Sequence, residues 1–147
     1  MSERRRLKFA DADAVAAEIG RLRKGYSRAG NWSLPQVCRH LEMAMRYSMK
    51  PAPDRKVETT WFQWVQLKIM LASGKIPAGV PAPERIVPPH DTPDAAIDEC
   101  LAALEELKYF KGQFAPHPFL GWIKHRDWVA LHLIHSARHL GFLSPIR

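Results

Sequence analysis

The spacing between four segments of helical pattern constrains the fold of this chain more than any other feature of its sequence. The first two segments, near residues 11–24 and 33–50, are separated by a short polar stretch. The last two, near residues 92–110 and 124–143, flank a loop, whereas a much longer crossover lies between the second and the third. A short turn makes successive helices antiparallel, but a long crossover allows them to run parallel. The spacing therefore predicts an all-α four-helix bundle whose second and third helices are parallel.

The second segment carries the clearest helix start. Ser33 and Gln36 have the spacing of a capping box, in which each side chain binds the backbone N–H of the other residue. The first segment can start at Asp11 or at Asp13, because either carboxylate can accept from first-turn amides. Thr92 has the same capping role in the prediction for the third segment.

The crossover from Pro51 to Thr92 contains two different parts. Trp61 to Leu71 follows a helical pattern that is apolar almost all round, so we expect an extra helix packed between the bundle and a second subunit, as in a homodimer. Residues 75–93 are rich in proline, which prevents a continuous helix. This part is either a fixed extended strap or a mobile lid, and the sequence leaves both open.

The fourth segment carries three histidines on one side of the expected helix. His135 and His139 are four residues apart, and a helix advances about 100° per residue, so they lie about 40° apart, one turn above the other. His132 falls on the same side. Leu131 and Phe142 share this stripe, so the imidazoles are expected to face a core.

A further histidine, His40, falls on the apolar face of the second helix together with Val37 and Leu41. Each neutral imidazole buries two nitrogens that need partners. A metal ion binds several such nitrogens at once, and two histidines at i and i+4 are a common source of neighbouring ligands for Zn²⁺. The alternative is that the histidines are hydrogen-bonded core residues, and spacing alone does not decide between the two.

Charge and composition give weaker constraints. Lys and Arg outnumber Asp and Glu by 22 to 15, for a formal net charge of +7. The charges fall on solvated helix faces without interleaved aromatic residues, which argues against nucleic-acid binding. Cys38 and Cys100 are expected in the core and not in a disulfide. Because no stretch has the length of a membrane span or the pattern of a signal peptide, we expect one cytoplasmic domain over residues 1–147.

Three stretches of the chain together resemble a known superfamily. They run from Asn31 to Leu41, from His117 to Gly121 and from Trp128 to Leu140. In order and spacing they resemble the DinB/YfiT-like superfamily, and the chain looks closest to one of its uncharacterised branches. The resemblance implies an up-down-down-up four-helix bundle. In this chain the bundle would carry an extra helix and a proline-rich strap in the crossover between the second and third helices.

The resemblance also implies a metal site. In the superfamily a divalent ion is held by one histidine of the second helix and an H-x-x-x-H pair of the last. By position these are His40, His135 and His139. His132 and His117 are expected either to support these ligands or to replace one of them.

The function implied by the resemblance is enzymatic. Characterised members of the superfamily include metal-dependent transferases and isomerases that use low-molecular-weight thiols such as bacillithiol, mycothiol or glutathione. The leading hypothesis is a transferase or hydrolase in which Zn, Ni or Fe activates a thiol or water against a small-molecule substrate. The alternative is a bundle of the stress- or damage-response kind that binds a metal or ligand without catalysis. The chain departs from many relatives at Arg138, where they have another histidine, and at Lys124, where they often have a capping Ser or Thr.

Overall fold

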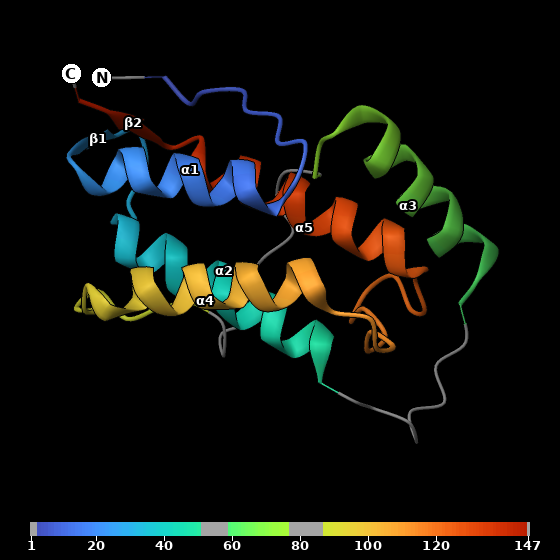
Figure 1. Cartoon of the computed structure of the whole chain (residues 1–147). Helices are drawn as coiled ribbons and strands as arrows, with labels where there is room; N and C mark the ends of the chain where they lie inside the picture. Colours follow the sequence, from blue (N-terminus) through green and yellow to red (C-terminus); the bar gives the residue numbers. More distant parts are fainter. Residues whose placement is uncertain (1–2, 51–58, 77–86, 147) are drawn as a thin grey trace.

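The computed structural model describes residues 3–50, 59–76 and 87–146 (Figure 1). Within these ranges the chain is mainly helical, as expected, and it also forms a small two-stranded sheet that the sequence analysis did not predict. The elements in chain order are α1 (Ala12–Arg23), β1 (Tyr26–Arg28), α2 (Leu34–Met49), α3 (Trp61–Ser73), α4 (Ala95–Tyr109), α5 (His125–Leu140) and β2 (Leu143–Pro145).

Local capping explains where the first two helices begin. The Asp11 carboxylate accepts from the backbone N–H of Ala14 at 2.8 Å, so α1 starts at the first of the two predicted caps. At the start of α2, Ser33 and Gln36 form the predicted capping box. Both caps satisfy backbone amides that have no partner within the helix, so α1 and α2 each begin at a defined residue.

The extra helix in the crossover is present as α3. Its start is a second capping box, between Thr60 and Gln63, which the sequence analysis missed, and it ends at Gly74 in a left-handed conformation. Only Leu67 is buried, whereas Trp61 and Phe62 are 76% and 65% exposed. Such an exposed apolar face is compatible with a second subunit, and the homodimer stays a prediction.

The start of α4 differs from the prediction. The Thr92 hydroxyl donates to the carbonyl of Pro89 at 2.5 Å and does not cap the helix, which begins only at Ala95. Asp94 occupies the cap position without a side-chain hydrogen bond. The cause is the turn that precedes the helix, in which the N–H of Thr92 also donates to Pro89.

The sheet joins two segments far apart in the sequence. β1 pairs with β2 in antiparallel register, with Ser27 opposite Ser144. The predicted fourth helix continued to residue 143, but α5 ends at Leu140 because the chain turns at Gly141 and extends to form β2. The backbone N–H of Arg5 donates to the Gly141 carbonyl at 2.7 Å, which attaches the N-terminal segment to the same place.

The core lies between α1, α2, α4 and α5. Each contributes a large side chain that is at most 2% exposed, namely Ile19, Leu41, Leu104 and Leu140 in that order. Cys38 and Cys100 are both fully buried and not in a disulfide, as predicted.

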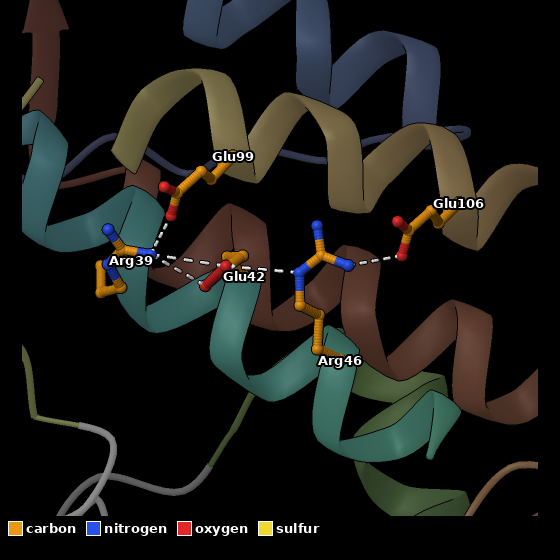
Figure 2. Close-up of polar contacts among 5 residues, drawn as sticks. All are labelled: Arg39, Glu42, Arg46, Glu99 and Glu106. Atoms are coloured by element: carbon orange, nitrogen blue, oxygen red, sulfur yellow. Dashed lines mark hydrogen bonds and ion pairs between the residues drawn. The ribbon is translucent and has the colours of Figure 1, made fainter. Parts of the chain in front are cut away.

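A network of charged side chains lies along the contact between α2 and α4 (Figure 2). Glu42, which is 8% exposed, contacts Arg39 at 3.4 Å and Arg46 at 3.3 Å on its own helix. Arg39 also pairs with Glu99 on α4, and Arg46 pairs with Glu106 at 2.6 Å. The two pairs between the helices lie about two turns apart on α2, and together they favour one alignment of α2 along α4.

The proline-rich stretch lies partly beyond what the structure describes. Residues 77–86 are outside the described residues, so the choice between strap and lid falls on them. No helix in the described part of the chain combines the length and the apolar character that a membrane span requires.

Candidate metal centre

Three histidines from two helices meet near one end of the core, and we call them the three-histidine cluster: His40, His135 and His139. His40 lies on the buried side of α2 and is 2% exposed, whereas His135 and His139 follow each other by one turn on α5 and are partly buried. Their ring centroids are 4.8 Å apart for His40 and His135, 4.5 Å for His40 and His139, and 4.7 Å for His135 and His139.

The ring nitrogens of the cluster lie close enough to share one ion. One potential ligand nitrogen of each ring lies within 4.8 Å of the other two. The Nε2 atoms of His40 and His135 are 2.9 Å apart. Two nitrogens bound to one tetrahedral Zn²⁺ at 2.0–2.1 Å are about 3.4 Å apart. The group could therefore hold a metal ion after side-chain shifts of an ångström or so.

Trp32 packs against the cluster from the residue just before the α2 cap. Its ring stacks on His139 at 5.6 Å with an interplanar angle of 15°, and lies 5.1 Å from the ring of His40. The indole restricts the orientation of both imidazoles, because each has a large flat neighbour on one side. The sequence analysis gave Trp32 no role at the site.

The surroundings keep His135 and His139 neutral. Burial lowers the pKa of His139 to about 3, with further contributions from His40, Arg138 and Arg4. Burial also places the pKa of His135 well below its ordinary value, and His139 and His40 lower it further. Neutral imidazole is the form that binds a metal ion, so these two side chains are ready to act as ligands at neutral pH.

His132 lies outside the cluster although it shares the helix face. It is 4% exposed, its ring stacks on Trp128 at 5.0 Å, and its Nε2 lies 2.8 Å from the Ser48 hydroxyl. The hydroxyl donates to the Met45 carbonyl at 2.7 Å, so His132 is the donor to Ser48. One face of α5 therefore meets two different environments on α2, the Ser48 hydroxyl below and the His40 ring above.

His117 organises its own loop. Its Nδ1 accepts from the backbone N–H groups of Phe119 and Leu120 at 3.0 and 3.2 Å. Its backbone exchanges hydrogen bonds with Gly121, whose φ of 73° suits a glycine. Burial lowers the pKa of His117 to about 4, which matches the acceptor role of a neutral ring. Neither His117 nor His132 belongs to the group of possible metal ligands found among the described residues.

The remaining histidines also lie away from the cluster. His90 and His125 are exposed. His125 stacks on Phe110 at 6.2 Å and its Nε2 lies 2.8 Å from the Phe110 carbonyl, which joins the start of α5 to the end of α4.

Comparison with known proteins places the chain in a family. The profile of the DUF1569 family, described as a protein of unknown function, matches residues 1–146. No curated protein and no solved structure matched the chain. Because the profile extends over nearly the whole sequence, the chain belongs to the DUF1569 family.

Proposed function

We propose that the protein is a divalent-metal-dependent enzyme of DinB/YfiT-like architecture whose ion is held by His40, His135 and His139. The observation that carries the proposal is the convergence of three imidazoles, with their ligand nitrogens within 4.8 Å of one another. A core histidine needs only a hydrogen-bond partner, as His132 has in Ser48. Three rings that direct nitrogens at one point have a common partner in a metal ion.

The proposed architecture is an up-down-down-up bundle of α1, α2, α4 and α5. The pairs between α2 and α4 support it: Arg39 pairs with Glu99, and Arg46 pairs with Glu106. Residue numbers therefore rise together along the two helices, as they do in parallel neighbours. Figure 1 agrees, since α2 and α4 both run from the left of the view to the right.

The other two helices run the opposite way in this proposal. Along the contact of α1 with α4, Asp13 pairs with Lys108 and Arg23 with Asp98, so residue numbers rise on one helix and fall on the other. The contact of α2 with α5 has the same sense, since His40 meets His135 and Ser48 meets the earlier His132.

The donor set suits a reactive ion. Three neutral nitrogen ligands leave coordination positions free, which is typical of catalytic and not of structural sites. A bound divalent ion would act as a Lewis acid and lower the pKa of a coordinated water or low-molecular-weight thiol. His40 is buried, whereas His135 and His139 are partly exposed, so we expect a small molecule to approach the ion from their side. We propose thiol- or water-dependent transfer or hydrolysis as the reaction class.

The second candidate is a metal-binding protein without turnover. It is favoured by the composition of the cluster, which among the described residues contains histidines and no carboxylate. An enzyme built on this cluster would need a general base for water or thiol from outside it, whereas a binding protein needs none.

The first experiment measures metal content. The chain is purified without a chelator and without a histidine tag, and the metal per chain is determined for wild type, His135→Ala and His90→Ala. His90 is an exposed histidine outside the cluster and serves as the matched control. We expect about one ion per chain in wild type and in the control, and its loss in His135→Ala with the helical circular dichroism retained. Absence of metal from all three, with no uptake of added Zn²⁺ or Ni²⁺, would overturn the proposal.

The second experiment separates the two candidates. Metal-loaded wild type and His135→Ala are assayed with a low-molecular-weight thiol and an aryl halide electrophile, following release of halide. Turnover in wild type that is lost in His135→Ala supports the enzyme. Stoichiometric metal without turnover against a broad panel of electrophiles and esters favours the binding protein.

A further inference from the structure

A groove with a volume of about 750 Å³ lies beside the cluster, between three segments of the chain. Its walls come from the N-terminal segment (Arg4 and residues 6–9), from residues 71–76 at the end of α3, and from one face of α5, formed by Ala130, Leu133, Ile134, Ala137 and Arg138. Figure 1 shows the blue N-terminal segment passing close to the upper end of α3 and to α5. A volume in the range of about 300–1,000 Å³ is typical of small-molecule sites.

The floor of the groove is apolar. Leu71 and Leu133 contribute from α3 and α5, and Leu7 and Phe9 from the N-terminal segment. All four pack against the main core and are only partly buried, so they keep apolar surface open toward the groove. The floor therefore suits the hydrocarbon or aromatic part of a ligand.

The ionisable residues of the groove are all cations. Among the described residues that line it, these are Arg4, Arg6, Lys8, Lys75 and Arg138, and no acidic residue is present. None of the five forms an ion pair with a carboxylate of the described residues.

Several arginines elsewhere in the described chain do have carboxylate partners. Arg5, which points to the other side of the same segment, pairs with Glu18 at 2.5 Å. Arg39 and Arg46 are likewise paired with carboxylates on α2 and α4. The groove thus gathers cations that the chain itself does not neutralise, and a cleft lined by one sign of charge concentrates ions of the opposite sign.

Two of the cations are held at the edge of the groove. A terminal nitrogen of Arg138 donates to the carbonyl of Ile76 at 3.0 Å, and the Arg4 guanidinium lies over the Phe142 ring at 5.3 Å. Both lower the pKa of His139, so this edge adjoins the three-histidine cluster. Arg138 and Arg6 also lower the pKa of Arg4, after the larger effect of burial.

We propose that this groove binds a small amphipathic anion, with its apolar body on the floor at Leu71 and Leu133 and its carboxylate, phosphate or sulfonate between Arg4 and Arg138. A charged hydrogen bond to a guanidinium supplies both affinity and orientation. The inference does not depend on a metal ion, because all of its contacts come from side chains outside the cluster.

The experiment compares two probes that differ in charge. 8-Anilinonaphthalene-1-sulfonate carries a sulfonate, and N-phenyl-1-naphthylamine has the same rings without it; both become fluorescent in apolar sites. The protein is first passed over a chelating resin, so that the result does not depend on metal. We expect the sulfonate to bind about tenfold or more tightly than the neutral probe, and its affinity to fall as salt is raised.

Variants assign the binding to the groove. Arg138→Gln should weaken sulfonate binding about tenfold and leave the neutral probe unaffected, since the loss of one charged hydrogen bond has this size. Arg126→Gln is the matched control, because Arg126 lies on the same helix and its side chain is 82% exposed. Arg4→Gln replaces Arg138→Gln if circular dichroism shows that the latter is unfolded. Equal binding of the two probes to wild type, or sulfonate binding that neither groove variant weakens, would overturn the proposal.

Discussion

Because His132 is buried, the free energy of unfolding should fall in acid by an amount that can be calculated from the pKa of this side chain. The ring is 4% exposed and burial lowers its pKa from 6.5 to about 3, with a smaller contribution from His117. Below pH 6.5 the unfolded chain takes up a proton at His132, while the folded chain stays neutral there until about pH 3. The contribution to stability is therefore fully present above pH 6.5 and is lost progressively as the pH falls between these two values.

The size of the effect follows from the difference in proton binding. Each pH unit below the unfolded pKa costs about 1.4 kcal/mol per group. Between pH 7.5 and pH 5.0, His132 alone should remove about 2 kcal/mol from the free energy of unfolding. His132→Phe keeps an aromatic ring against Trp128 but cannot titrate, so it should show a pH-dependent loss smaller than that of wild type by about 2 kcal/mol.

The assay is urea unfolding of metal-free protein at pH 7.5 and 5.0, followed by circular dichroism. Subtracting the two free energies for each variant removes any cost of the substitution that does not depend on pH. Ser48→Ala is the control, because it removes the hydrogen-bond partner of His132 and leaves the buried imidazole in place. Wild type and Ser48→Ala should lose similar amounts. An equal loss in His132→Phe would refute the assignment of the effect to this ring.

Two further predictions concern the backbone and use the same unfolding measurement at pH 7.5. A Cβ at Gly141 would collide with the backbone oxygen of Arg5, so Gly141→Ala should destabilise the protein by about 1–3 kcal/mol. A Cβ at Gly20 would have no atom within 4 Å, so Gly20→Ala should stabilise the protein by about 0.5–1 kcal/mol through α1. If both substitutions act alike, the attachment of the N-terminal segment at Gly141 has no energetic role. Ser33→Ala should cost about 1 kcal/mol because it opens the capping box with Gln36, and a change under a few tenths would contradict that role.

Local signals predicted most of the helices. The caps at Asp11 and Ser33 act within one turn, so their effect is readable from neighbouring residues alone. The box at Thr60 and Gln63 gives the same signal and could have been found. Thr92 shows the limit of such reasoning, because its hydroxyl has a competing acceptor in the Pro89 carbonyl.

Non-local contacts account for what the sequence did not reveal. A strand of three residues is too short to show an alternating pattern, and β1 exists only because β2 is brought beside it. The cluster itself was readable from the faces of two helices. The distinct place of His132 was not, because it depends on which residue of α2 lies opposite. His132 is about 4.5 Å below His135 along the helix axis, far enough to meet Ser48.

The positions of the three histidines along the chain determine when the cluster can form during synthesis. His40 precedes His135 by 95 positions, and α3 and α4 lie between the two helices that carry them. On the ribosome, α2 emerges long before α5, and the N-terminal parts of a protein are the first that are free to fold. Until α5 has left the exit tunnel, the nascent chain presents only one imidazole of the cluster, that of His40, and a single imidazole is a weak ligand for a metal ion. The full cluster could therefore capture an ion only after α5 has been synthesised and has left the tunnel.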